Sequence, residues 1–254
     1  MRDIVIFTKK EWLEAWRTKK LLLILTVFVF FGILSPLIAI LTPEILKSSL
    51  GDGVQISLPE PTSVDSWVQF YKNLTQIGIY LLAIFFSSSV SGEVKSGSLI
   101  NLVTKGLSRS AIITSKFIMI SLLSIAAILL SFGVTAAYTS VYFTDKASPH
   151  IFLALIPFLV FILYFSSIIV LGSTLFKSGY LSLLFSLLMI GLMYLLNIVE
   201  SVRAYNPIML IGENVSILEG LTELSEMNWA IVVSLFLSAA CFFISIKVMD
   251  RKKL

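Results

Sequence analysis

Few residues of this chain have the types and spacing that enzyme chemistry needs. The sequence holds one histidine, His150, and one cysteine, Cys241, which excludes a disulfide framework and a Cys/His metal site. It has no GxxxxGK[ST], HExxH or GxSxG motif, so a P-loop, a zinc protease site and a hydrolase nucleophile have no candidate residues. We therefore expect no enzyme activity in this chain and no cofactor or metal bound by it.

The charged residues that could act together gather in residues 92–117, GEVKSGSLINLVTKGLSRSAIITSKF. This stretch lies between two long apolar segments and carries Glu93, Lys95, Lys105, Arg109 and Lys116. Two interpretations compete for it. It is either a connection whose positive charges only orient the chain in a membrane, or a helix that docks on a partner.

The composition indicates that membrane-spanning helices position this stretch. Of the 254 residues, 57% are hydrophobic and 13% are charged, whereas soluble domains are about 45–50% apolar and about 25% charged. Apolar runs long enough to cross a bilayer predict six helical spans. We expect an all-α membrane protein with a single transmembrane domain over residues 1–254 and spans at about 21–41, 74–90, 112–142, 151–175, 180–199 and 229–246.

The connection between the first two spans is predicted over residues 42–72. Turn signals stand at residues 51–53 and 59–61, and Pro36 is expected to kink the first span. Ser63 and Asp65 are candidate caps of a helix that leads into the second span.

The distribution of basic residues predicts the orientation. If both termini face the cytosol, the inner segments hold 15 of the 19 Lys and Arg residues. We therefore expect a multi-pass protein of a bacterial plasma membrane, with the N- and C-termini and residues 92–116 in the cytosol. The excess positive charge then reflects topology and contact with anionic lipid, not nucleic acid.

The middles of the predicted spans hold no Asp, Glu, Lys, Arg or His. Ionisable groups inside a membrane usually mark ion pathways or proton relays. Their absence argues strongly against a proton-coupled transporter and moderately against a sodium-coupled one. If the protein moves a solute, its energy should come from another subunit.

Residues 1–20 predict an amphipathic helix that lies at the membrane interface. At 100° per residue, Trp12 and Trp16 share one face with Val5, Thr8 and Ala15, and the opposite face carries Asp3, Lys10, Glu14 and Arg17. Phe7 falls on the polar side, so the amphipathicity is imperfect. The alternative is a plain positively charged flank of the first span.

A second short helix is predicted within residues 96–106. Leu99, Ile100, Leu102 and Val103 give it an apolar side, while Asn101, Thr104 and Lys105 are polar. Gly106 would end it at the C′ position, and Ser108 could cap the helix that follows. Such a helix between two spans is more than a connection requires.

These residues resemble the signature of ABC-2-type transporter permeases. The resemblance runs from Glu93 through Gly97-Ser98-Leu99 and Leu102 to Leu107-Ser108-Arg109 and Lys116. Residues 9–20, with Glu11 and Arg17, are similar to the opening interfacial helix of the family. Ser98 replaces the usual Thr, and Gly106 stands where Pro is common.

The resemblance implies a non-catalytic subunit that pairs with a second permease, identical or paralogous, and with two cytosolic ATPase subunits that bind ATP and Mg. It implies that Glu93 and Arg109 form or orient charge pairs and that Leu99, Leu102 and Val103 sit in the ATPase groove. The residues implied in coupling are Glu93, Gly97, Leu99, Leu102, Val103, Ser108, Arg109 and Lys116, with Glu11, Trp12, Trp16 and Arg17 on the interfacial helix. It also implies an external re-entrant segment at Asn206 and Pro207, for which an ordinary loop is the alternative.

The function we expect is the transmembrane subunit of an ABC exporter, with a hydrophobic or amphipathic substrate such as a peptide, lipid or drug. The alternatives are a non-transporting membrane sensor or immunity subunit and a subunit of an ABC sodium-ion exporter. An intramembrane enzyme is disfavoured because no catalytic set is visible.

Overall fold

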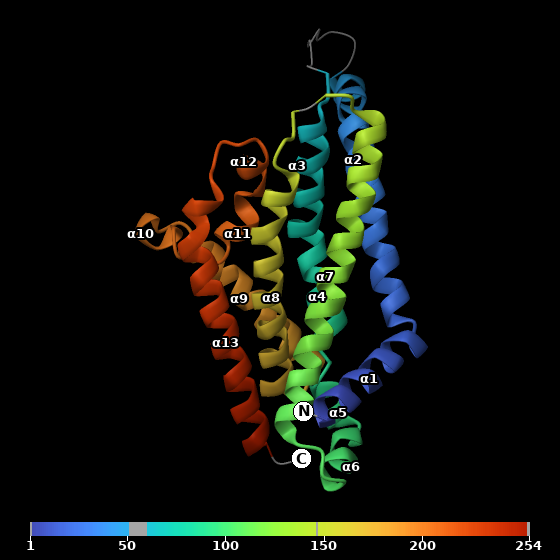
Figure 1. Ribbon diagram of the computed structural model, residues 1–254, viewed down its shortest axis with the longest axis vertical. Helices are drawn as coiled ribbons and strands as arrows, with labels where there is room; N and C mark the ends of the chain where they lie inside the picture. Colours follow the sequence, from blue (N-terminus) through green and yellow to red (C-terminus); the bar gives the residue numbers. More distant parts are fainter. Residues whose placement is uncertain (1, 51–59, 146, 253–254) are drawn as a thin grey trace.

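The computed structural model describes residues 2–50, 60–145 and 147–252, and within these ranges it consists of helices and their connections (Figure 1). Six helical segments are long and apolar enough to cross a membrane. The predicted all-α, six-span architecture is confirmed. Figure 1 shows both termini at the end of the bundle that also carries α5 and α6.

The chain starts with α1 (Arg2–Arg17), which meets α2 (Lys20–Leu50) at an elbow. Lys19 has a φ of 57° there, a left-handed conformation that turns the chain sharply between the helices. α2 extends beyond the predicted end of the first span and contains both Pro36 and Pro43. The turn predicted at residues 51–53 lies outside the described residues.

The second span is continuous and contains a π-helical turn. It consists of α3 (Ser63–Asn73), a π-helical turn (Leu74–Gly78) and α4 (Ile79–Phe86). Thr62, not Ser63, is the N-cap of α3, and its backbone N–H donates to the Asp65 carboxylate at 2.8 Å. The predicted role of Asp65 at this helix start is therefore confirmed, and the cap lies one residue earlier than expected.

A turn at residues 87–90 leads from α4 to α5 (Ser91–Lys95), which is followed by α6 (Ser98–Thr104). The backbone N–H groups of Val90 and Ser91 donate to the Ser173 hydroxyl at 2.9 and 3.1 Å. These donors have no partner within their own helix, so Ser173 supplies the acceptor that the start of α5 lacks.

The remaining spans are α7 (Arg109–Tyr142), α8 (Ile151–Leu175), α9 (Gly179–Leu196) and α13 (Asn228–Arg251). Three short helices stand between α9 and α13: α10 (Glu200–Arg203), α11 (Met209–Gly212) and α12 (Asn214–Leu218). A 3₁₀ turn (Leu224–Met227) leads into α13. α8 is the most buried span and packs against α7, α9 and α13.

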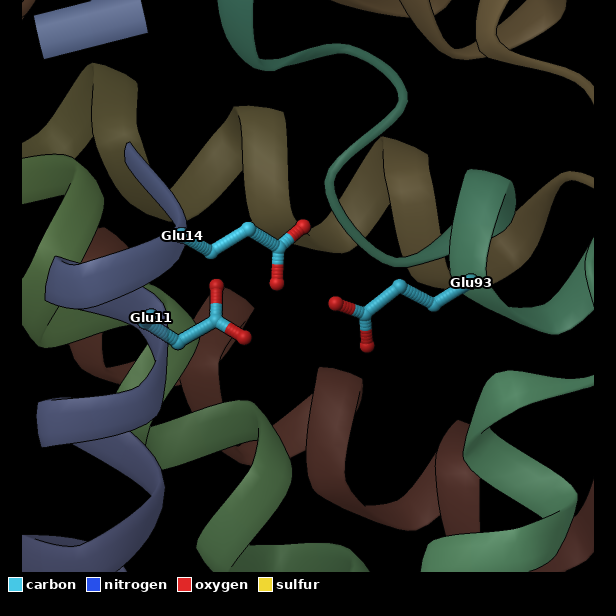
Figure 2. Close-up of side chains that lie close together, drawn as sticks. All are labelled: Glu11, Glu14 and Glu93. Atoms are coloured by element: carbon cyan, nitrogen blue, oxygen red, sulfur yellow. The ribbon is translucent and has the colours of Figure 1, made fainter. Parts of the chain in front are cut away.

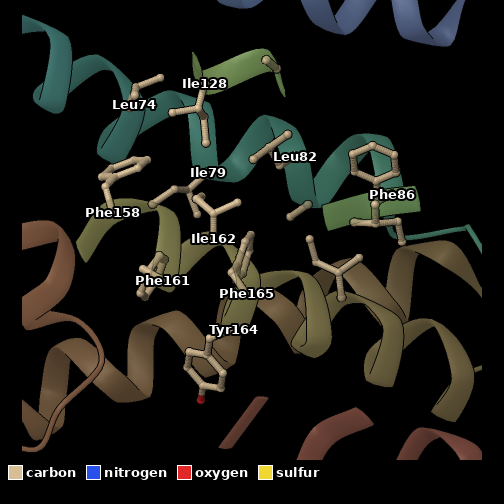
Figure 3. Packing of buried hydrophobic residues seen from close by; sticks show 14 of the residues in the cluster. Leu74, Ile79, Leu82, Phe86, Ile128, Phe158, Phe161, Ile162, Tyr164 and Phe165 are labelled. Atoms are coloured by element: carbon tan, nitrogen blue, oxygen red, sulfur yellow. The ribbon is translucent and has the colours of Figure 1, made fainter. Parts of the chain in front are cut away.

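Side chains of α4 and α8 interlock in the core, as Figure 3 shows for Ile79, Leu82, Phe158, Phe161 and Phe165. In a bilayer, helices gain little from the hydrophobic effect between them, and close packing holds them together instead. Gly32 of α2 illustrates this closeness. A Cβ at that position would lie 2.7 Å from the Ser131 carbonyl oxygen of α7.

Candidate functional site

The elements of residues 92–117 meet α1 at the end of the bundle where both termini lie (Figure 1). Glycines shape this region, because Gly97 just before α6 has a φ of 73° and Gly106 just after it a φ of 94°. Proline cannot adopt that conformation, since its ring holds φ near −65°. Ser108 caps α7 and accepts a hydrogen bond from the Ala111 N–H at 3.3 Å.

Lys116 of α7 is the centre of a buried charge cluster. Its side chain is about 5% exposed, and its Nζ lies 2.7 Å from Glu11 Oε2 and 2.7 Å from Glu93 Oε1. Glu11 belongs to α1 and Glu93 to α5, so one ammonium group joins three helices. A buried ion pair is costly to break, because the partner left behind is a buried charge.

Lys10 extends the cluster toward solvent. Its Nζ lies 2.8 Å from Glu93, 2.9 Å from Glu11 and 2.7 Å from Glu14. Burial alone would lower the pKa of Lys10, but hydrogen bonds to Glu14 and Glu93 and the charge of Glu11 together raise it above its ordinary value. Lys10 therefore stays charged across the physiological range.

The three carboxylates of the cluster face one another, as Figure 2 shows for Glu11, Glu14 and Glu93. One oxygen from each lies within 4.8 Å of the others, a spacing that could hold a metal ion. Lys10 and Lys116 already place ammonium groups at 2.7–2.9 Å from these oxygens. The two lysines thus offset most of the negative charge of the three carboxylates, and the arrangement suits a mechanical joint between helices.

Arg109 lies outside this cluster. Its Nη1 donates to the backbone carbonyl oxygens of Met249, Asp250 and Lys252 at 2.8, 2.7 and 2.9 Å. These carbonyls lie at the C-terminal end of α13, where a cation is favoured by the helix dipole. Lys252 in turn donates to the Thr174 carbonyl of α8 at 2.6 Å. Glu93 forms charge pairs, as expected, whereas Arg109 fastens α7 to α13.

The three leucine and valine residues expected in a partner's groove differ in exposure. Leu99 is fully buried in the core of this chain, and Leu102 and Val103 are half-buried against the same core. Leu99 therefore offers no surface to a partner, which corrects the expectation for that residue. The buried side of α6 covers the apolar core of this chain. Ile100 of the same helix is 40% exposed to solvent.

α1 has one side buried against the bundle and another side with exposed tryptophans. Phe7, Glu11 and Ala15 are buried at i, i+4 and i+8 against the bundle, while Trp12 and Trp16 are 46% and 66% exposed. Arg17 is exposed as well. Ala15 was expected on the Trp face and instead lies on the buried one. Phe7, the exception to the predicted amphipathic pattern, lies on the buried side of α1 that also places Glu11 in the cluster.

Asn206 and Pro207 begin a segment that folds back onto the bundle. Both are buried, and the Asn206 side chain donates to the Met193 carbonyl at 2.7 Å. α11 and α12 pack against α8, and the Asn214 side chain donates to the Ala154 carbonyl of that helix at 2.8 Å. The segment is therefore anchored at two points.

Lys10, Glu14 and Lys20 were not among the predicted site residues. In the sequence they have the pattern of exposed charges on an amphipathic helix. The side of α1 that faces the bundle is the one with Phe7, Glu11 and Ala15, and this choice of side brings Lys10 and Glu14 to the cluster.

Two comparisons bear on the family of this chain. The family model described as ABC-2 family transporter protein matches residues 5–225. The chain is also similar to the uncharacterized transmembrane protein YxlG of Bacillus subtilis (strain 168), with 24% identity over 180 residues that cover 70% of each chain.

Proposed function

The chain belongs to the ABC-2 family of transporter proteins, and on that premise we propose that it is the transmembrane subunit of an ATP-driven exporter. ATP and Mg would be bound by a separate ATPase, because no P-loop occurs in this sequence. The observation that carries the proposal is the buried charge cluster, which joins α1, α5 and α7 at one end of the bundle.

In this proposal the end with α5, α6 and both termini faces the cytosol. The distribution of Lys and Arg supports that orientation, since basic residues favour the cytosolic side. α1 would then lie at the inner membrane interface, with Trp12 and Trp16 toward the headgroups.

The surface that would contact the ATPase is the outer side of α6. Ile100, Asn101 and Thr104 are exposed there, in contrast to the buried Leu99. Leu102 and Val103 would support this helix from beneath. A partner groove that receives Ile100 could push on α6 without disturbing the core of this chain.

A push on α6 would reach the spans through two connections. Glu93 of α5 would carry it to Lys116 of α7 and Glu11 of α1, and Arg109 would carry it to the end of α13. Helices joined in this way move as a rigid body, which is one of the established ways in which a membrane bundle can switch.

The spans suggest the class of substrate and the assembly. Their middles are uncharged, which suits a hydrophobic or amphipathic molecule. α9 and α13 carry many exposed apolar side chains, which could face lipid, substrate or a second permease. We expect a dimer of permeases, and a re-entrant position for residues 206–218 on the outer side.

The test is co-purification of the chain with a P-loop ATPase encoded beside it. Ile100→Asp should abolish this association and the membrane-dependent ATP turnover, because it places a charge at the contact. Leu221→Asp is the matched control, since Leu221 is an exposed apolar residue near the opposite end of the bundle. Unchanged association in Ile100→Asp would refute the proposed contact, and a chain that binds no ATPase at all would refute the function.

A further inference from the structure

A cavity of about 470 Å³ lies beside the charge cluster, between α1, the start of α2, the turn at residues 87–90, α5 and α7. One part of its wall is apolar and formed by Phe86, Met119, Ile120 and Leu123. The other part carries charges and hydroxyl groups. A cavity with these two parts suits an amphiphile, whose head and body differ in the same way.

Six charged side chains line the cavity, and five of them belong to the cluster: Lys10, Glu11, Glu14, Glu93 and Lys116. Lys20 is the sixth. Its Nζ lies 4.5 Å from the centre of the Phe86 ring, and it makes no ion pair with any carboxylate in the described part of the chain. The Lys116 ammonium repels it, and Glu11 and Glu14 attract it more weakly, in each case without contact.

Glu14 is the carboxylate best placed to receive a ligand. Its side chain is about half exposed, and Lys10 is the partner of one of its oxygens, Oε2. The cavity therefore offers an ammonium group at Lys20 and a half-exposed carboxylate at Glu14 in one lining.

The charge balance of the lining selects the kind of head. Three lysines and three glutamates give a formal sum of zero. A ligand with a single charge would leave this partly enclosed space unbalanced, which is costly away from bulk water. A zwitterionic head adds no net charge and can pair with both the Lys20 ammonium and the Glu14 carboxylate.

The position of Lys20 indicates that the ligand is a lipid. It is the first residue of the apolar span Lys20–Ile45, so its ammonium lies at a boundary between hydrocarbon and water, where lipid headgroups are found. We propose that the cavity binds an aminophospholipid of the phosphatidylethanolamine type. The phosphate pairs with Lys20, the ammonium group of the head pairs with Glu14, and the start of the acyl chains lies on Phe86 and Ile120.

The test is native mass spectrometry of the full chain in detergent, with phosphatidylethanolamine, phosphatidylglycerol and phosphatidylcholine of identical acyl chains. The unaltered chain should retain phosphatidylethanolamine in preference to the other two. Lys20→Gln should lower that retention by at least about fivefold, the factor for one lysine near a membrane surface. Lys9→Gln is the matched control, because it removes one positive charge from an exposed position of α1.

Glu14→Gln tests the zwitterionic feature separately. It leaves the lining with an excess positive charge, so the preference should move from phosphatidylethanolamine to phosphatidylglycerol. A change in packing alone would lower the retention of both lipids. Lys20→Arg should keep the preference of the unaltered chain, which distinguishes a lost charge from a misfolded variant.

Three results would overturn the proposal: equal losses in Lys20→Gln and Lys9→Gln, equal retention of phosphatidylglycerol and phosphatidylethanolamine by the unaltered chain, or binding of soluble glycerophosphoethanolamine as tight as that of the lipid. The last result would mean that the apolar wall contributes nothing. The measurement needs no ATPase and no defined orientation, so its failure would leave the proposed function untouched.

Discussion

Lys116 is the residue on which the charge cluster depends. Lys116→Gln would remove the buried ammonium from the Glu11 and Glu93 carboxylates and leave them the partly exposed Lys10, and removal of one partner from a buried charge pair costs about 3–5 kcal/mol. We expect a loss of that size in the free energy of unfolding, measured by denaturant titration in detergent. Lys105→Gln, at an exposed position of the same region, should change it little.

A double variant sharpens this prediction. Adding Glu93→Gln to Lys116→Gln removes one of the two carboxylates that face each other, so part of the lost stability should return. Additive losses in the double variant would show that Lys116 and Glu93 do not interact in the membrane-embedded protein.

Asp145 is a second residue with a definite expected effect. Its carboxylate accepts hydrogen bonds from the Ser63 hydroxyl and from the Ser63 backbone N–H at 2.8 Å, which ties Asp145 to the start of α3. These bonds hold the pKa of Asp145 below its usual value. Asp145→Asn should cost up to about 1 kcal/mol at neutral pH, as for other lost caps at exposed sites.

The pH dependence of that effect follows from the direction of the shift. A depressed pKa in the folded state means that the contribution is present above the unfolded pKa of about 3.9 and is lost as pH falls through the folded value. The difference in unfolding free energy between the unaltered chain and Asp145→Asn should therefore shrink as the pH is lowered from 6 to 3. A constant difference would contradict the assignment.

Three of the five residues of the charge cluster could be predicted as site residues from the sequence, but their contacts with one another could not. Glu11, Glu93 and Lys116 are far apart in the chain, and their contact depends on how α1 crosses α5 and α7. Leu99 shows the same limit, because an apolar side of a short helix can face its own core or a partner, and periodicity does not distinguish the two.

At the scale of the elements, Gly32 lets α2 pack closely against α7. Gly32→Ala would place a Cβ 2.7 Å from the Ser131 carbonyl oxygen, which is backbone and cannot move aside easily. Overpacking of this kind costs about 1–3 kcal/mol. We expect a lower midpoint of thermal unfolding for this variant.

Gly133→Ala provides the matched control for Gly32→Ala. Gly133 lies in α7, and a Cβ there would meet no described atom within 4 Å. Alanine also has the higher helix propensity, by about 1 kcal/mol. Its midpoint should be unchanged or higher, and equal losses in both variants would rule out the steric explanation.

The extents of the elements were predictable only where a strong signal ended them. Ser108 and Gly106 gave the boundary between α6 and α7, because capping chemistry is local. The end of α2 was missed, since Pro43 and the polar residues after it are typical of a loop and yet stand inside the helix. The break at residues 87–90 depends on Ser173 of another helix, which no local pattern reveals.

In the whole molecule, Arg109 connects the region of α6 to the last span. Arg109→Gln would remove the charged donor from the Met249, Asp250 and Lys252 carbonyls. We expect faster amide hydrogen exchange in residues 247–252 and little change in α6. Lys105→Gln, on the other side of Gly106, should leave this exchange unaltered.

If Arg109→Gln left the exchange of residues 247–252 unchanged, α13 would have to receive motion by another route. If exchange rose and ATPase binding persisted while transport fell, Arg109 would act in transmission and not in docking. The two measurements together therefore separate the roles of this end of the bundle.

The length of α2 has a consequence outside the bundle. Its 31 residues span about 46 Å, whereas the hydrocarbon core is about 30 Å thick, and Lys20 stands at one boundary of that core. If the helix is perpendicular to the membrane, about 15 Å of it projects beyond the core on the far side, where α3 begins beside it. In the proposed orientation this end stands outside the cell, so a binding protein raised against it could label the transporter on intact cells.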